Sequence, residues 1–257
     1  MLFIIMSIHT DEYYNGQALQ DKFVLNMLKF KRNGFFLELG SNKPREINNS
    51  YLLEKSYGWR GIMVEYDKSY ESIYKAERPN SFHAMEDATI IDYNDALKQV
   101  NFPKHMDYLQ IDLEPGNGST LAALKNLNNT IFNEYKFATV TFEHDICNGN
   151  TVPTIFNQTR EESRKIFESR GYVCVFHDIN NDGWWDIEHN RHLIRVEQTP
   201  NPLMQSYTSS MYPFEDWYVH PDLVDMSYVQ SVIEKNKDIY LPHPICGSTI
   251  NFHAIRY

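Results

Sequence analysis

The fold is decided by residues 34–42, which read GFFLELGSN, an apolar run that ends in glycine and polar residues. A short apolar run closed by glycine predicts a buried strand. A second run of this kind, GIMVE, covers residues 61–65. The intervening residues 46–57 carry apolar side chains at helical spacing. Strand, helix and strand in this order predict one unit of a parallel sheet.

The alternation continues along the chain. Further strands are predicted at 81–85, 107–112, 137–142 and 172–176, and helices at 70–76, 92–100, from 119 onward and at 161–170. This pattern predicts an α/β fold with a Rossmann-like sheet and helices on both faces. Ligands of such sheets bind at the carboxyl ends of the strands. The residues that end each strand are therefore the candidates for a functional site.

The periodicity weakens after Asn180. Residues 184–212 are rich in aromatic residues, histidine and proline and predict an inserted lid segment. A small strand at 192–196, a late strand at 214–219 and a helix at 226–235 follow, and 225–257 forms a C-terminal extension. With 257 residues, the chain is expected to form a single domain over 1–257.

Composition excludes several classes of protein. Asp and Glu number 34 against 24 Lys and Arg, which gives a formal net charge of -10. Nucleic acid is not expected as a partner, because phosphate binding requires a basic face. No apolar stretch approaches the roughly 20 residues that span a bilayer. The three cysteines are far apart and no secretory signal is present, so a cytoplasmic location is expected.

The first strand ends in Glu38, Gly40, Ser41 and Asn42. A glycine at this position lets a ligand approach the backbone closely. The dinucleotide fingerprint G-x-G-x-x-G is absent, because Lys43 and Pro44 follow Asn42. A pyrophosphate cradle is therefore disfavoured, and so is NAD.

The next two strands also end in carboxylates. Glu65 follows Gly40 by 25 residues, and a carboxylate there can accept both hydroxyls of a ribose. Ribose recognition without a phosphate cradle points to S-adenosylmethionine, although buried strands also end in charged residues without function. Asp87 follows the third strand and either accepts from an adenine amino group or stabilises a turn.

The fourth and fifth strands end in Asp112 and in the run Glu143, His144 and Asp145, with Glu114 close by. So many like charges repel unless a cation or shared protons offset them. Two interpretations remain open. In one, Asp112, Glu143 and Asp145 bind Mg2+ and His144 is the general base. In the other there is no metal, and Asp112 lies beside the cofactor. Asp112 is a candidate catalytic residue together with His144.

Several longer motifs resemble the FkbM-like family of S-adenosylmethionine-dependent methyltransferases. The resemblance covers roughly residues 17–224 and is most specific over 34–67. The motifs are QDKFVL (20–25), GFFLELGSN (34–42), NNSYLLEKSYGWRGIMVEYD (48–67), DYLQIDLEP (107–115), TFEHD (141–145), TREESRKIFESRGYVCVF (159–176) and FEDWYVHPDLV (214–224).

The resemblance implies a single methyltransferase domain with a seven-stranded sheet whose last strand is antiparallel. It implies cofactor contacts near Glu38, Gly40, Asn42, Glu65 and Asp87. It also implies methyl transfer, usually to an oxygen of a small metabolite, polyketide or sugar. Some similar enzymes bind Mg2+ through acidic residues at the ends of the fourth and fifth strands.

The chain departs from the family where Lys43 and Pro44 replace a frequent glycine, and the 184–212 segment is long. Trp184, Trp185 and Tyr212 are expected to cover the acceptor. Two alternatives remain: a methyltransferase-like binding module without activity, and another nucleoside-cofactor enzyme such as a short-chain dehydrogenase. The second lacks a Tyr-x-x-x-Lys pair in the right region.

Overall fold

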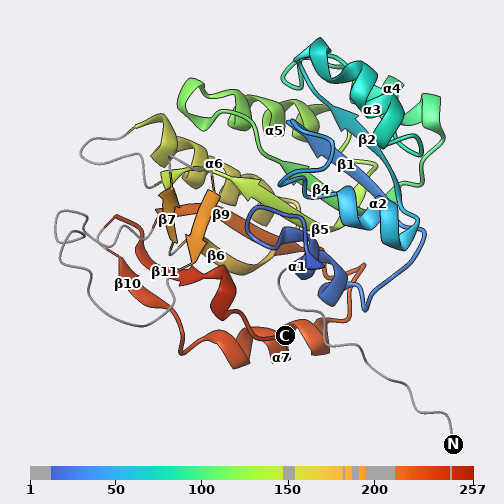
Figure 1. The fold of residues 1–257 in the computed structure, drawn as a ribbon. Helices are drawn as coiled ribbons and strands as arrows, with labels where there is room; N and C mark the ends of the chain where they lie inside the picture. The colour runs from blue at the N-terminus through green and yellow to red at the C-terminus, as the bar shows by residue number, and fades with distance from the viewer. Residues whose placement is uncertain (1–12, 147–153, 182, 187–190, 195–211, 244) are drawn as a thin grey trace, which may run out of the picture.

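The computed structural model describes residues 13–146, 154–181, 183–186, 191–194, 212–243 and 245–257 (Figure 1). The helices are α1 (Gln20–Met27), α2 (Tyr51–Tyr57), α3 (Glu71–Glu77), α4 (Tyr93–Val100), α5 (Ser119–Thr130), α6 (Ile155–Ser169) and α7 (Met226–Asn236). The strands are β1 (Phe35–Leu39), β2 (Arg60–Val64), β3 (Phe82–Ala84), β4 (His105–Ile111), β5 (Lys136–Glu143), β6 (Val173–Asn181), β7 (Gly183–Asp186), β8 (Arg191–Ile194), β9 (Tyr212–Val219), β10 (Leu241–His243) and β11 (Gly247–Asn251).

The main sheet has the strand order β10-β11-β6-β9-β5-β4-β1-β2-β3. Strands β1 to β5 pair in parallel, and β9 lies antiparallel between β5 and β6. The predicted Rossmann-like α/β class and the antiparallel late strand are confirmed. The predicted count of seven strands is wrong, because β11 and β10 of the 225–257 segment extend the sheet to nine strands beyond β6.

Helices cover both faces of the sheet, as predicted. One core cluster joins the sheet to α4, α5 and α6 through residues such as Leu97, Leu124 and Phe167. The opposite cluster joins it to α1, α2, α3 and α7, with Phe23 and Trp217 among its fully buried side chains. Figure 1 shows α5 and α6 on one side of the sheet and α1 and α7 on the other. No helix within the described part of the chain is long and apolar enough to cross a membrane.

The helix predicted at 46–57 begins only at Tyr51. Residues 45–50 form turns instead, and Ile47 has a φ of +49°. The polar side chains of Asn48 and Ser50 are buried and bond to other elements. Short polar side chains with such partners compete with helix formation, which explains the late start.

The sixth strand continues past the predicted end at residue 176 and reaches Asn181. Its pairing with β9 is irregular between Cys174 and Asn180, and Asp178 has a φ of +52°. The backbone N–H of Asp178 donates to Asp216 Oδ1 at 2.7 Å. This bulge accommodates the polar pair His177 and Asp178 inside the strand. The strand was predicted to end before them because the apolar pattern stops at Phe176.

Part of the predicted lid, 184–212, lies outside the described residues. Strands β7 and β8 form an antiparallel pair in which Trp184 lies opposite Leu193 and Trp185 opposite His192. Residues 187–190 and 195–211 are not among those that the structure describes. The assignment of this segment as a lid stays a prediction.

The carboxyl ends of β1 and β4 meet at the point where the strand order reverses. The chain proceeds from β1 outward to β2 and β3 and then returns to β4 on the other side of β1. Gly40 follows β1 with a φ of +77°, and a Cβ there would lie 1.8 Å from the carbonyl oxygen of Asp112. Only glycine permits this approach.

We predict that Gly40→Ala lowers the free energy of unfolding by about 3 kcal/mol, from the left-handed φ and the backbone clash together. Gly171→Ala is the matched control, because Gly171 has a φ of +82° and its Cβ would meet nothing within 4 Å. The control is expected to cost about 1 kcal/mol. Urea unfolding of both variants measures the difference, and equal losses would contradict the predicted contact.

Candidate functional site

The ends of β1, β2, β3 and β4 line one cavity of about 640 Å³. Its volume lies within the range of sites for small molecules and cofactors. The seven residues predicted to bind a cofactor all line it: Glu38, Gly40, Ser41, Asn42, Glu65, Asp87 and Asp112. The topology thus brings together the residues that the strand ends singled out.

The lining is acidic. Among the described residues that line the cavity there are eight carboxylates and no Lys, Arg or His. The eight are Glu38, Glu46, Glu65, Asp67, Glu86, Asp87, Asp112 and Glu114. Such a lining repels phosphate groups and attracts a cationic ligand.

Glu38 lies near the carboxyl end of β1 and is 1% exposed. Its Oε2 accepts from Ser50 Oγ at 2.8 Å and from Asn48 Nδ2 at 3.2 Å. Burial raises the pKa of this carboxyl, while Arg78 and these donors oppose the rise. Next to it, Ser41 donates its hydroxyl to the carbonyl of Glu38 at 3.2 Å.

Glu65 follows β2 and is held by the backbone of two loops. Its Oε2 accepts from the N–H of Asn42 at 2.8 Å, and its Oε1 accepts from the N–H of Asp67 at 2.9 Å. A carboxylate oxygen can accept more than one hydrogen bond. Glu65 is therefore fixed in place and keeps acceptor capacity toward the cavity.

Asp87 stabilises a turn, which is one of the two roles that the sequence left open. Its Oδ1 accepts from the N–H and the hydroxyl of Thr89, at 2.8 and 2.7 Å, which makes it a turn residue. Its side chain also lines the cavity. The turn fixes the carboxylate and leaves Oδ2 available to a ligand.

Two buried amides in the cavity wall were missed from sequence. Asn49 Oδ1 and Gln110 Oε1 are buried and have no hydrogen-bond partner, and both residues line the cavity. Buried polar atoms without partners are uncommon in proteins and call for a ligand or water. The signal that identifies Gln110 is a polar residue inside the apolar run of β4, on the same strand face as Asp112.

Asp112 and Glu143 are hydrogen-bonded to each other at the ends of β4 and β5. Burial and the charges of Asp112, Asp145 and Glu215 raise the pKa of Glu143 well above its ordinary value. Burial also raises the pKa of Asp112, although the bond from Glu143 opposes the rise. The pair therefore offsets its repulsion by sharing a proton, which was one of the two outcomes expected for this edge.

The predicted metal ligands are not gathered into one set. Within the described residues, ligand atoms of three or more His, Cys, Asp or Glu side chains lie within 4.8 Å of one another only in the group His144, Asp178 and Asp216. Asp112, Glu143 and Asp145 do not meet this distance. The donor set expected for Mg2+ is therefore not formed in this structure.

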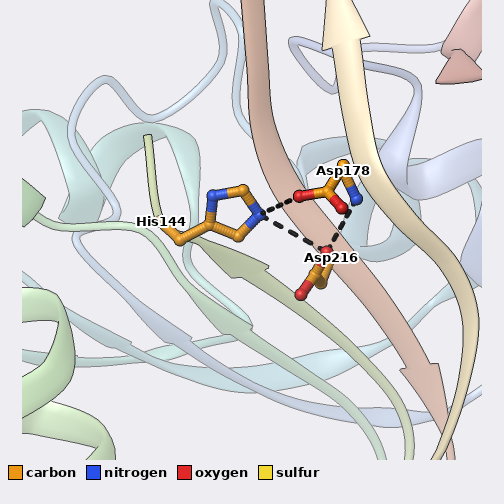
Figure 2. A group of neighbouring side chains, drawn as sticks. All are labelled: His144, Asp178 and Asp216. Atoms are coloured by element: carbon orange, nitrogen blue, oxygen red, sulfur yellow. Dashed lines mark hydrogen bonds and ion pairs between the residues drawn. The ribbon is translucent and has the colours of Figure 1, made fainter. Parts of the chain in front are cut away.

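His144 does not line the cavity and lies beside Asp178 and Asp216, which bond to arginines of α6. It is fully buried, and its Nε2 points toward Asp216 Oδ1 at 3.4 Å and Asp178 Oδ1 at 3.7 Å (Figure 2). Its Nδ1 accepts from the N–H of Ile146 at 3.2 Å, so Nε2 carries the proton. Glu143 bonds to Asp112, which lines the cavity. Successive residues of a strand point to opposite faces, so the side chain of His144 points away from that of Glu143. This placement gives no support to His144 as the catalytic base.

Arginines of α6 fill the site around His144. Arg160 and Arg164 bond to Asp178 and Asp216 at 2.6–2.9 Å. Burial alone would raise the pKa of Asp178, but bonds from His177 and Arg160 lower it to about 2. Two carboxylates face two guanidinium groups, so this cluster leaves no charge for a metal ion and fastens α6 to β6 and β9.

Three residues were predicted to cover the acceptor, and the structure describes their backbone only. Trp184 and Trp185 lie in β7 and Tyr212 begins β9. Their side chains are outside the described residues, and their role at the acceptor stays a prediction.

No protein-family model and no curated protein matches the chain. Among solved structures it is similar to an O-methyltransferase from Bacillus cereus in complex with SAH, with a TM-score of 0.47 and 12% identity over 84% of this chain and 93% of that chain. It is also similar to precorrin-6y C5,15-methyltransferase from Geobacter metallireducens GS-15, with a TM-score of 0.45 and 11% identity over 82% of this chain and 92% of that chain.

A third similar structure is the O-methyltransferase TomG from Streptomyces achromogenes, involved in tomaymycin synthesis and solved with SAM. Its TM-score is 0.44, with 12% identity over 78% of this chain and 79% of that chain. Likeness at this level does not establish an activity. The resemblance to the FkbM-like family rests on the sequence motifs alone.

We predict that Arg164→Met lowers the free energy of unfolding by about 3 kcal/mol at pH 7, because it leaves a buried carboxylate unpaired. The folded pKa of Asp216 is held well below its ordinary 3.8, against the effect of burial, by His144 and Arg164. The contribution of this network is therefore complete above about pH 4 and is lost as the pH falls through the folded value. Denaturant unfolding from pH 7 to pH 3 should show the loss shrinking below pH 4.

Arg170→Met is the control, because Arg170 bonds only to neutral groups of Asn128 and Asn133. A loss in Arg170→Met as large as that in Arg164→Met would contradict the account of the network, and so would a loss in Arg164→Met that does not change with pH.

A second prediction concerns Glu215, which accepts from Gln20 and Trp217 and whose pKa burial raises to about 8. Between its ordinary value of 4.5 and 8, the folded state binds more protons than the unfolded state, so stability falls as pH rises through this window. Glu215→Gln cannot ionise and keeps an acceptor. The variant should gain a few degrees in Tm over the wild type at pH 8 and less at pH 5. A gain that does not change with pH would show that Glu215 is ionised in the folded protein.

Proposed function

We propose that this protein is an S-adenosylmethionine-dependent methyltransferase that methylates a hydroxyl oxygen of a small molecule or sugar. The observation that carries the proposal is the cavity at the strand-order reversal, whose described lining contains eight carboxylates and no basic side chain. A cofactor with phosphates would be repelled there, whereas a sulfonium cation with a ribose is favoured.

The residues present fit this cofactor. Glu65, fixed by two backbone N–H groups, is suited to accept from the ribose hydroxyls. Asp87 Oδ2 is suited to the adenine amino group. The unpartnered oxygens of Asn49 and Gln110, together with Glu38, are suited to an ammonium group at the amino-acid end. These three clusters of acceptors match the three groups of donors that the cofactor carries.

When bound, the cofactor supplies a methyl group on a cationic sulfur that transfers in line to an acceptor oxygen. Asp112 lines the cavity and is the predicted catalytic residue that remains in reach of it. A hydroxyl acceptor must lose a proton, and the carboxylate of Asp112, in its bond with Glu143, is the group placed to receive it. Positioning and exclusion of water provide most of the rate enhancement.

Calorimetric titration with S-adenosylhomocysteine tests the proposal. We predict binding by the wild type, and a dissociation constant weakened about 10- to 100-fold in Glu65→Gln, because charge-assisted bonds to the ribose are lost. Glu134→Gln is the control, since Glu134 is exposed and bonds to Lys104 on the surface. The control should bind as the wild type does.

Two results would contradict the proposal in different ways. Absence of heat and of a thermal shift at millimolar ligand would remove the cofactor assignment. Binding without methyl transfer to any of a panel of hydroxylated acceptors would favour a binding module that has lost its activity.

A further inference from the structure

An arginine that does not line the cavity bonds to one residue of its wall, Asn48, and to three residues behind it. Arg78 lies between α3 and β3 and is fully buried. Its guanidinium donates to Glu54 Oε2 at 2.8 Å, to the carbonyl of Pro44 at 3.1 Å, to Asn48 Oδ1 at 2.8 Å and to Ser50 Oγ at 2.8 Å. All three of its nitrogens therefore have partners.

Three of these partners belong to residues 44–50, and 46–50 of this segment were predicted to be helical but are not. Glu46, Asn48 and Asn49 of this segment line the cavity. The bonds from Arg78 to Pro44 at one end and Ser50 at the other hold the whole segment against α3. The segment has turns in place of a helix, so these bonds substitute for the regular backbone bonds it lacks.

The same bonds continue to Glu38. Ser50 receives a bond from Arg78 and donates its hydroxyl to Glu38 Oε2, and Asn48 accepts from Arg78 through Oδ1 and donates to Glu38 through Nδ2. Glu38 thus has its Oε2 fixed through two side chains that a single cation orients. Its remaining acceptor capacity faces the cavity that it lines.

The surroundings of Arg78 favour a planar, forked cation. The guanidinium carbon lies 5.8 Å from the centre of the Phe36 ring and 5.9 Å from that of Tyr51. Its positive charge faces the carboxylates of Glu54 and Glu38, both buried. A lysine would keep the charge but could not reach Pro44, Asn48, Ser50 and Glu54 together.

We propose that Arg78 is a positioning residue of the cavity: it fixes the 44–50 wall and the orientation of Glu38 before any ligand binds. It donates to the carbonyl of Pro44 and so holds the beginning of a wall that has turns in place of a helix. The nature of the ligand rests on the proposed function, whereas the ordering of the wall does not.

Hydrogen–deuterium exchange of the full chain tests the ordering without a ligand. In Arg78→Lys, peptides covering residues 44–50 should exchange faster than in the wild type, while those covering β4 and β5 keep their protection. Arg170→Lys is the matched control, since Arg170 also makes a forked set of bonds but far along the chain, to Asn128 and Asn133. Unchanged exchange at 44–50, or equal loss of protection throughout the chain, would overturn the proposal.

Titration with S-adenosylhomocysteine then tests the consequence for binding. Arg78→Lys should raise the dissociation constant about tenfold or more, because oriented charge-assisted bonds are lost. Arg170→Lys should leave it unchanged. Faster exchange at 44–50 with unchanged affinity would overturn the positioning role. Failure of the wild type to bind would overturn the proposed function and leave the exchange result as the test of Arg78.

Ser50→Ala provides a second variant if Arg78→Lys does not fold. It removes one of the two links between Arg78 and Glu38 and leaves the link through Asn48 and the other bonds of the guanidinium. Affinity for S-adenosylhomocysteine should fall while the Tm changes little. Wild-type affinity in this variant would show that the orientation of Glu38 does not depend on the Ser50 hydroxyl.

Discussion

The close approach of the backbone after β1 to the backbone after β4 is the constraint on which the site depends. Gly40, with a φ of +77°, leaves the space that the carbonyl of Asp112 occupies. Because the two strand ends touch there, Glu38, Gln110 and Asp112 can face one cavity. The order of the strands reverses at this point, and ligands of open α/β sheets bind at such reversals.

The carboxylates of the described residues include three groups with different surroundings. In the cavity lining, eight carboxylates, of which Glu46 is paired with Lys43, create a field that suits a cationic ligand. Behind the wall, Arg78 neutralises Glu54 and holds Glu38 through Asn48 and Ser50. Beside His144, Arg160 and Arg164 neutralise Asp178 and Asp216. A net charge of -10 alone does not distinguish these roles, since burial and pairing decide which carboxylates remain available.

The alternation of strands and helices made the sheet, and the seven strand-end residues of the cavity, predictable from sequence. Three features were beyond it. Residues 46–50 belonged to the predicted helix, but buried bonds to Arg78 and Glu38 override the helical spacing there. His144 lies against Asp216, which is 72 residues further along the chain. The bulge at Asp178 depends on a bond to Asp216, which lies 38 residues away in the chain. Each of these failures involves a long-range polar contact that a local pattern does not encode.

An experimental structure of the full chain with S-adenosylhomocysteine tests the central claim most directly. The account predicts the ligand in the cavity between the ends of β1 and β4, with the ribose hydroxyls on Glu65 and the amino-acid end beside Glu38 and Gln110. A ligand bound elsewhere, or a ribose turned away from Glu65 with the cavity still lined as described, would contradict it.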